Sequence, residues 1–226
     1  MRLSIVIPAL EEESALPLLL RDLQPLRARG AEIIVADGGS NDGTVAAAGA
    51  LADIVLAAPR GRALQLNAGA ARARGELLLF LHADSRVPPP CVAAIAALAG
   101  AAPRWGFFRV RLRGVSRWLG VVARCMAWRS RLSGIATGDQ GLFVPRALFT
   151  AVGGYPAQPL MEDIEICRRL RRHGAPLAHP AFIESSGRRW DRDGALATIL
   201  LMWRLRLCYF LGADPAALHE AYYGQR

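Results

Sequence analysis

Residues 32–43 read EIIVADGGSNDG, a β-branched apolar run that ends in an acidic, glycine-rich turn. The run predicts a buried strand, and the turn residues predict where it stops. The flanking segments continue an alternation, with strands expected at 3–7, 32–36, 53–57 and 77–81 and helices at 11–29, 44–51 and 63–74. Strands separated by helices predict an α/β fold with a mostly parallel sheet covered on both faces. Ligands of such sheets bind beyond the carboxyl ends of the strands.

The second half of the chain follows a less regular pattern. Helices are expected at 91–99, 115–132, 162–172 and 195–211, and strands at 105–112 and 142–144. The helix at 195–211 is the apolar C-terminal helix of the expected fold, and a short tail follows it. No internal repeat, linker or composition boundary divides the chain, so residues 1–226 are expected to form one domain.

The composition leaves two interpretations of the charge open. The formal net charge is +9, and all 28 basic residues are arginine. Together with abundant Ala, Leu and Gly, this is typical of codon bias in a GC-rich genome. The alternative is an anionic partner: a sugar diphosphate, a lipid surface or a polynucleotide.

Cysteine spacing and hydropathy indicate the compartment. Cys91, Cys125, Cys167 and Cys208 are widely separated, which favours a reducing compartment over a disulfide framework. The first residues predict a strand rather than a signal peptide, and residues 195–211 are interrupted by Arg204 and Arg206, so no spanning segment is expected. A cytoplasmic protein is therefore expected. Residues 195–211 are also compatible with an interfacial helix at the inner face of the plasma membrane, a core helix or a homodimer face.

Carboxylates follow three of the expected elements. Asp37 ends the second strand before Gly38 and Gly39, where it would accept from a base or ribose or simply form a turn. His82 and Asp84 follow the apolar strand 77–81. If the segment is extended they point the same way and suit Mn²⁺ or Mg²⁺ bridging a diphosphate, and the alternative is another turn.

The third acidic position begins a helix. Glu162 and Asp163 open the helix 162–172, whose last turn is basic, so they would complement the helix dipole. The functional alternative is that one of them is a general base that takes a proton from an acceptor hydroxyl. Arginines supply the opposite charge: Arg60 and Arg62 flank Gly61 before a helix, and residues 188–190 (RRW) offer a second clamp.

Five segments in this order resemble the family 2 glycosyltransferases with the GT-A fold. They are IVIPALEEE (5–13), IIVADGGSNDGT (33–44), GRALQLNAGAARARGELLLFLHAD (61–84), GDQGLFV (138–144) and MEDIEICRRLRRHG (161–174). The likeness runs from residue 3 to about residue 190. It is nearest to a short bacterial subgroup of the arsenosugar-biosynthesis or radical-SAM/selenodomain-associated type, in which SSGRRW (185–190) precedes an apolar helix.

The resemblance implies a division of labour. Residues 1–90 would bind the nucleotide-sugar, residues 91–190 would hold the acceptor and catalytic groups, and residues 191–226 would form a helical segment. Asp163 would be the base, with Glu162 beside it. Asp84, with His82, would bind a divalent Mn²⁺ or Mg²⁺. Asp37 would contact the base, usually uracil. The implied nucleotide-sugar contacts are Pro8, Ala9, Glu11, Asp37, Gly39, Arg62, Asn67, Asp84, Gln140, Arg189 and Trp190.

Two positions depart from the family pattern. His82 stands where the family has the first acid of D-x-D, so an imidazole would replace a carboxylate among the metal ligands. Ser186 stands where the processive members have the Gln of Q-x-x-R-W. The implied reaction is transfer of a hexose from a UDP-sugar to a small-molecule or lipid-phosphate acceptor, by single displacement with inversion.

Two rival functions stay open. A nucleotidyltransferase usually carries a glycine-rich, basic N-terminal loop, whereas residues 8–13 are PALEEE. A non-enzymatic nucleic-acid binder would need arginines on one face with exposed aromatics, and these arginines are spread. No nucleic-acid partner is therefore expected.

Overall fold

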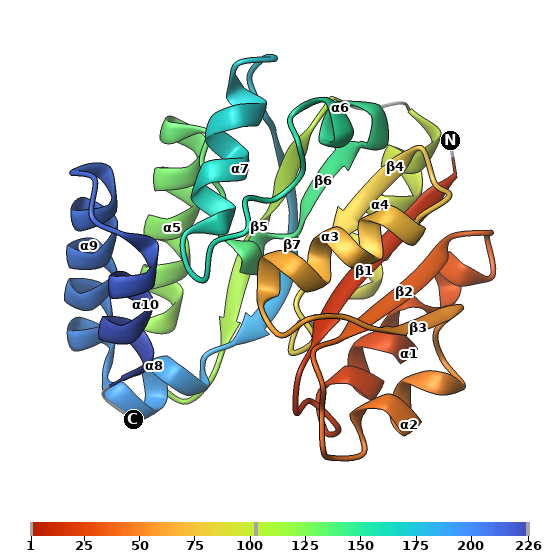
Figure 1. The fold of residues 1–226 in the computed structure, drawn as a ribbon, viewed down its shortest axis with the longest axis horizontal. Coiled ribbons are helices and arrows are strands. Elements are labelled where there is room, and N and C mark those ends of the chain that lie inside the picture. Colours follow the sequence, from red (N-terminus) through yellow and green to blue (C-terminus); the bar gives the residue numbers. More distant parts are fainter. Residues whose placement is uncertain (1, 102–103, 225–226) are drawn as a thin grey trace.

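The computed structural model describes residues 2–101 and 104–224, and within them one sheet holds seven strands in the order β3-β2-β1-β4-β6-β5-β7 (Figure 1). The strands are β1 (Leu3–Ala9), β2 (Glu32–Asp37), β3 (Ile54–Ala57), β4 (Leu77–Phe80), β5 (Gly106–Arg113), β6 (Leu142–Pro145) and β7 (Leu177–Ser186). Neighbouring strands are parallel except where β6 pairs with β4 and with β5. The expected mostly parallel α/β sheet is confirmed.

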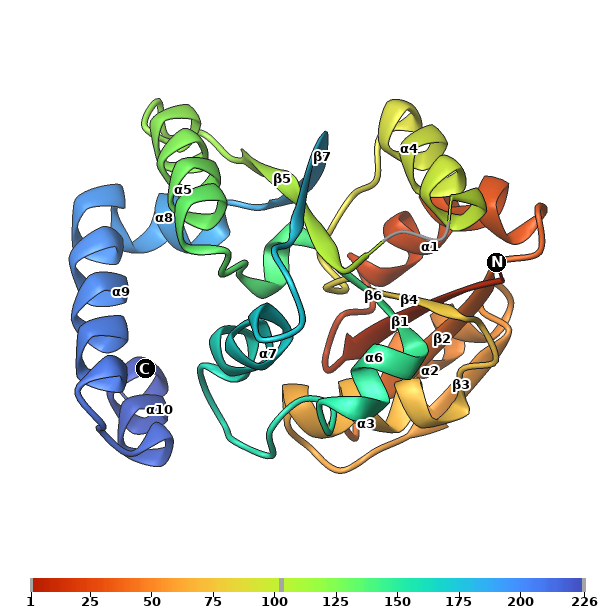
Figure 2. The ribbon, with the colours of Figure 1, turned by 90° about the horizontal axis from the view of Figure 1, so that it is seen from above.

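Helices cover both faces of the sheet (Figure 2). They are α1 (Leu16–Arg27), α2 (Thr44–Gly49), α3 (Arg62–Arg72), α4 (Pro89–Gly100), α5 (Leu119–Ser133), α6 (Arg146–Ala151), α7 (Glu162–Arg171), α8 (Arg188–Asp193), α9 (Ala195–Phe210) and α10 (Pro215–Tyr223), with a 3₁₀ turn, η1, at Gly138–Gln140. Within the described part of the chain, no helix is long and apolar enough to cross a membrane.

Two apolar layers form the core, one on each face of the sheet. The first packs α1, α2 and α4 against side chains such as Ile5 and Leu79. The second packs α3, α6 and α7 against the opposite side chains, such as Val6 and Leu78. Successive side chains along a strand point to opposite faces, so strands that are apolar throughout bury both faces. A third, smaller cluster joins β5, α5 and α9.

The parallel strands bring the predicted acidic loops to one edge of the sheet. Ala9 pairs with Asp37 and Val6 with Phe80, so β1, β2 and β4 end on the same side. The loops that begin at residues 10, 38 and 81 therefore all leave from that edge, which is where ligands of parallel sheets bind.

The structure corrects the expected start of the first helix. It begins at Leu16 rather than at residue 11, because backbone N–H groups of residues 11–13 donate to side chains in the loop after β2 and at the start of α2. Acidic residues before the helix thus hold a neighbouring loop instead of forming its first turn.

The second correction concerns the segment after β4. It was expected to be extended, but the Ser85 N–H donates to the His82 carbonyl at 3.1 Å and closes a turn. His82 and Asp84 therefore do not alternate along an extended strand.

Four elements in the C-terminal half were not predicted from the sequence. These are α6, β7, α8 and α10. β7 contains Pro180 and pairs with β5 across a register shift between Phe108 and Arg109, so it lacks a clean alternating pattern.

Candidate active site

The loop after β2 is organised by Asp37. Its carboxylate is 6% exposed and accepts from the N–H groups of Gly39 at 2.9 Å and Ser40 at 3.0 Å, and from the Ser40 hydroxyl at 2.6 Å. Gly39 has φ 89°, a conformation that suits glycine. Asp37 therefore shapes this turn, and its contact with a nucleotide base stays a prediction.

The loop after β1 packs against that turn. Glu11 has φ 55°, a left-handed conformation unusual for Glu, and its carboxylate accepts from the Asn41 N–H at 2.8 Å. Pro8 and Ala9 end β1, and the Ala9 carbonyl accepts from the Gly38 N–H at 2.9 Å. The predicted nucleoside contacts thus lie together at the sheet edge, on a backbone held by side-chain hydrogen bonds.

Gln65 on α3 joins the ends of β1 and β2 at this edge of the sheet. Its amide donates to the carbonyls of Ala9 at 2.7 Å and Ala36 at 3.0 Å, and the side chain is 4% exposed. Sequence reasoning missed Gln65, because a glutamine on a helix gives no signal that its partners are the ends of two strands.

Two carboxylates converge on Arg188. Its Nη2 lies 3.8 Å from Glu12 Oε2 and 3.8 Å from Asp84 Oδ2. Burial raises the pKa of Glu12, and the nearby charge of Asp84 raises it further. Asp84 and a basic clamp at residues 188–190 were predicted, whereas Glu12 and the contacts of Arg188 with these two acids were not. The glutamates quoted in PALEEE were the signal for Glu12, but they did not show which of the three faces Asp84.

The imidazole of His82 faces a different neighbour. A Cβ added to Gly138 would meet His82 Nε2 at 2.3 Å, so the ring packs directly on that glycine. Nε2 is buried and has no hydrogen-bond partner within residues 2–101 and 104–224. Burial and the positive charge of Arg62 lower the pKa of His82 to about 3, which keeps the ring neutral. Its role as a metal ligand stays a prediction.

Glu162 is buried and paired with Arg62. Arg62 Nη1 lies 3.0 Å from Glu162 Oε1, and the two side chains are 40% and 3% exposed. Burial raises the pKa of Glu162, and Arg62 opposes this rise. Arg62 loses some basicity to burial, but Glu162, Tyr223 and Asp163 together raise its pKa above the ordinary value.

Asp163 has different hydrogen-bond partners from Glu162, although its charge raises the pKa of both Arg62 and Glu162. Its carboxylate accepts from the Gly138 N–H at 3.1 Å and from its own helix at the Ile164 N–H at 2.8 Å. Its negative charge raises the pKa of Arg129 on α5 and of Arg206 on α9, which burial lowers. The side chain is half-buried and anchored by backbone, with arginines near it.

A further, half-buried carboxyl lies near Asp163. Asp139 in η1 accepts from the Thr137 hydroxyl at 2.5 Å, and burial raises its pKa. Sequence reasoning included residues 138–144 in a motif but did not single out Asp139. Three carboxyls (Asp139, Glu162 and Asp163) and three arginines (Arg62, Arg129 and Arg206) therefore form one cluster where α3, α5, α7 and α9 meet.

Carboxylate oxygens are the groups here that suit a hard divalent cation. Mg²⁺ is typically bound by one or two carboxylates together with substrate phosphates, and Glu12 and Asp84 already share one cationic group. Within the described residues no group of three or more His, Cys, Asp or Glu side chains could hold a metal ion, and Mg²⁺ commonly completes a site of one or two carboxylates with water and substrate phosphates. The donor set thus fits a cation bound with a diphosphate.

Comparison with protein families decides the family. The sequence model of the family described as Glycosyl transferase family 2 matches residues 4–129. The chain belongs to this family. The matched stretch includes the loops after β1, β2 and β4, which lie at the sheet edge described above.

A curated relative and several solved structures share this architecture. An uncharacterized glycosyltransferase of Mycobacterium tuberculosis is 32% identical over 163 residues, which cover 67% of this chain and 62% of that protein. S. aureus TarS 1–349, solved in complex with UDP, has a TM-score of 0.64 at 18% identity over 82% of this chain and 60% of its own.

Another similar structure contains a metal. Glucosyl-3-phosphoglycerate synthase from Mycobacterium tuberculosis, solved with Mn²⁺, UDP and glucosyl-3-phosphoglycerate, has a TM-score of 0.58 at 22% identity. The match covers 82% of this chain and 70% of that one. These structures show that the enzyme has the GT-A-like α/β fold.

Two predicted contacts of the enzyme have their amides engaged inside the protein. Asn67 exchanges hydrogen bonds with the Tyr155 backbone, at 2.8 Å to its carbonyl and 3.0 Å from its N–H. Gln140 is fully buried, and its amide accepts from Ser130 and Thr137 and donates to a carbonyl of β5. Any effect of these two residues on a nucleotide-sugar would therefore be exerted through the loops they hold.

Arg189 and Trp190 contact other parts of the protein than Arg188, which lies near Glu12 and Asp84. The Arg189 guanidinium stacks on Tyr222, 3.7 Å from its ring centroid, and lies 3.6 Å from Asp193. Trp190 packs with Ile199 in the small cluster under α5. Arg188, rather than its two neighbours, reaches the acids at the sheet edge.

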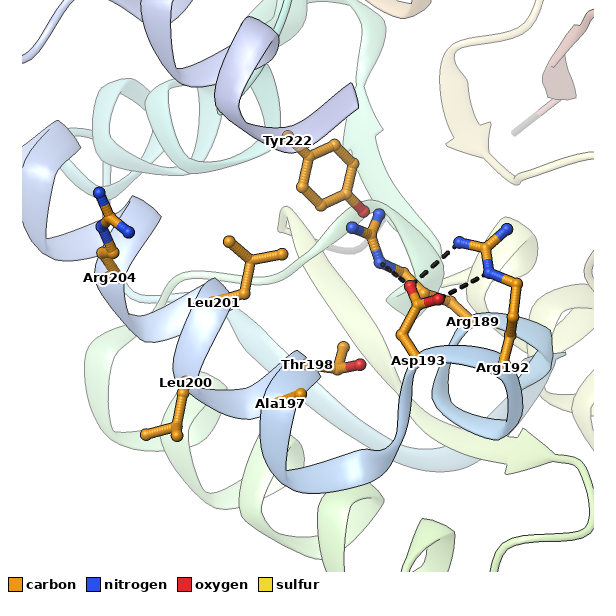
Figure 3. A pocket seen from close by; sticks show the side chains of 9 residues that line it. All are labelled: Arg189, Arg192, Asp193, Ala197, Thr198, Leu200, Leu201, Arg204 and Tyr222. Atoms are coloured by element: carbon orange, nitrogen blue, oxygen red, sulfur yellow. Dashed lines mark hydrogen bonds and ion pairs between the residues drawn. The ribbon is translucent and has the colours of Figure 1, made fainter. Parts of the chain in front are cut away.

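A groove of about 770 Å³ opens between α8, α9 and α10 (Figure 3). Its lining combines three arginines with apolar and hydroxyl side chains: Arg189, Arg192, Asp193, Ala197, Thr198, Leu200, Leu201, Arg204 and Tyr222. The next residue on α10, Tyr223, raises the pKa of Arg62. The end of α10 that contributes Tyr222 to the groove is therefore also near Arg62 of the carboxylate cluster.

Proposed function

We propose that the enzyme transfers a hexose from a UDP-sugar to an acceptor hydroxyl by metal-assisted single displacement with inversion. One contact carries the proposal: the ring of His82, two residues before Asp84, packs on Gly138, whose N–H holds Asp163. A cation-binding acid and a candidate base thus belong to one connected unit. Family membership and the UDP in the TarS structure support the donor class.

The chain's own residues would divide the work. Asp84 and Glu12 would hold the cation, which when bound neutralises charge on the leaving diphosphate. Arg188, between them, would add a second positive charge at the same place. Asp163 would take the acceptor's proton. Two N–H groups fix the position of its half-buried carboxylate, as a general base requires.

Glu162 has a different place in this scheme. It is buried against Arg62, and its carboxylate faces the arginine rather than solvent. We assign it to positioning Arg62 at the start of α3, where the guanidinium would meet the donor.

The acceptor would enter from the groove. Arg192 and Arg204 at its walls, with Leu200 and Leu201, suit a compound that carries a phosphate or carboxylate next to an apolar part. A small anionic metabolite and a lipid phosphate both match this chemistry. The assignment to the short bacterial subgroup and to the cytoplasm stays a prediction.

The test distinguishes loss of metal binding from loss of the base, and both from a general effect of removing an acid. Calorimetry of UDP binding with and without Mn²⁺ is made on the wild type, Asp84→Asn and Asp163→Asn, followed by donor turnover. We expect Asp84→Asn to lose the Mn²⁺-dependent part of UDP affinity. We expect Asp163→Asn to bind UDP normally but turn over about 10²–10⁴-fold more slowly. Exposed Glu76→Gln, just before β4 and so at the opposite end of that strand from Asp84, is the matched control.

Two outcomes would refute the assignment. Equal Mn²⁺ dependence in Asp84→Asn would remove the metal role, and near-normal turnover in Asp163→Asn would remove the base role. Release of pyrophosphate from UTP and a sugar phosphate would instead favour the nucleotidyltransferase alternative.

A further inference from the structure

Two helices expose apolar side chains in regular stripes. Trp118, just before α5, and α5 itself carry one stripe, and α9 carries the other; successive members are separated by one, three or four residues. The exposed members are Trp118, Val121, Cys125, Trp128 and Leu132 for α5, and Leu196, Leu200, Trp203, Leu207 and Phe210 for α9, with Leu211 directly after it. Such spacing puts each set on one face of its helix.

The exposure of these side chains is large. Trp128 is 72% exposed, Trp203 67% and Leu211 78%. Single exposed apolar residues are common on proteins, but contiguous apolar stripes usually mark an interaction surface.

The two helices are neighbours. Ile199 on α9 packs in the same small cluster as Val122 and Met126 on α5. Figures 1 and 2 both place α5 and α9 at the end of the molecule away from α1, α2 and α3. We call the two stripes together the α5–α9 face.

The charge of this face is of one sign. Residues 119–133 and 195–210 contain no Asp or Glu. Exposed Arg117, Arg124 and Arg131 follow one edge of the α5 stripe, and Arg204 flanks the α9 stripe. Tryptophan and arginine around an apolar stripe are typical of helices that lie at the boundary between lipid headgroups and acyl chains.

A second copy of the chain fits this face less well. In a two-fold interface the same patch meets itself, so arginines from both copies would be brought together with no acid on either helix. Anionic headgroups supply the missing negative charge.

We propose that the α5–α9 face binds the surface of an anionic phospholipid bilayer, with both helices lying on it. Leu200 and Arg204 also line the groove, so this contact would place the groove opening next to the headgroups. The binding itself is independent of the transfer reaction and can be measured without it.

Vesicle flotation of the whole protein tests the proposal. We expect about tenfold or more stronger binding to vesicles with about 30% phosphatidylglycerol than to pure phosphatidylcholine, and weaker binding at high salt. Trp128→Ser with Trp203→Ser should reduce binding to the anionic vesicles about tenfold or more. The matched control replaces Leu18 and Val45, 40% and 45% exposed on α1 and α2, with serine. It should bind like the wild type.

Cys125 provides a direct probe of the face. It is exposed, whereas Cys91 and Cys167 are buried, so in a Cys208→Ser background an environment-sensitive dye will label Cys125. We expect a blue shift of the dye on adding anionic vesicles, and circular dichroism of each variant shows that it is folded.

Three results would overturn the proposal. They are no flotation with anionic vesicles, equal binding to neutral ones, or sedimentation as a dimer that the two Trp→Ser changes convert to a monomer. The last result would identify the face as a contact between copies of this chain. None of these results depends on UDP-sugar turnover.

Discussion

The Arg62–Glu162 pair joins the start of α3 to the start of α7, and its removal should have a measurable, pH-dependent cost. The residues are 100 positions apart, and Glu162 is 2% exposed. Arg62→Ala would leave a buried carboxylate without its partner. Breaking a fully buried pair in this way costs about 3–5 kcal/mol. Because the Arg62 side chain is 40% exposed, solvent screens the interaction, and we expect about 1–3 kcal/mol at neutral pH.

The pH dependence follows from the sign of the Glu162 shift. Burial raises its pKa above 4.5, so its contribution to stability is fully present below 4.5 and is lost as the pH rises through the folded-state pKa. Arg62 opposes that rise. Without Arg62 the folded-state pKa climbs further, so more stability is lost at high pH. Arg62→Ala should therefore cost clearly more at about pH 7.5 than at about pH 5.

Urea unfolding at both pH values measures this. The series is wild type, Arg62→Ala, Glu162→Gln and the double variant, with exposed Arg60→Ala as the control for losing an arginine from the same loop. We expect Glu162→Gln to remove most of the pH dependence and the double variant to be less destabilised than the sum of the two. A cost for Arg62→Ala that is the same at both pH values, or equal to that of Arg60→Ala, would refute the reasoning.

Two further changes test how the C-terminal half is held. Gly106→Ala would put a Cβ 2.2 Å from the Leu177 carbonyl oxygen, so β5 and β7 must separate, and we expect about 1–3 kcal/mol lower stability in urea unfolding. Asn67→Ala would leave both backbone groups of Tyr155 unpaired and cost about 2–3 kcal/mol. A UDP affinity that falls much more than stability in Asn67→Ala would instead favour direct contact with the donor.

The sequence predicts the N-terminal half of the fold well because its signals are local. Each strand there is a short apolar run, and each run ends at a turn residue such as Gly38 or His82. The parallel arrangement follows from the helices between the strands, and it places their carboxyl ends on one edge without any knowledge of distant contacts.

The C-terminal half depends on contacts that no local pattern encodes. β7 holds its place by pairing with β5, about 70 residues earlier, and a proline and a register shift remove its alternating pattern. The prediction of an extended segment at residues 82–85 was wrong for a related reason. A short polar segment after a strand has no periodicity, so its extended and turned forms cannot be told apart from the residues alone.

The two acids at the start of α7 show how one sequence motif can enter two different environments. Glu162 and Asp163 begin α7, as helix-dipole stabilisation requires, and the Asp163 carboxylate accepts from the helix's own Ile164 N–H. Their environments nevertheless differ. Glu162 is buried against Arg62, whereas Asp163 is half-buried and held by Gly138.

Successive positions on a helix point about 100° apart, so neighbouring acids with the same local chemistry enter different surroundings. The partners that distinguish them, Arg62, Arg129 and Arg206, come from three other helices. The motif therefore marks both acids as candidates, and the fold adds that Asp163 is the more accessible of the two.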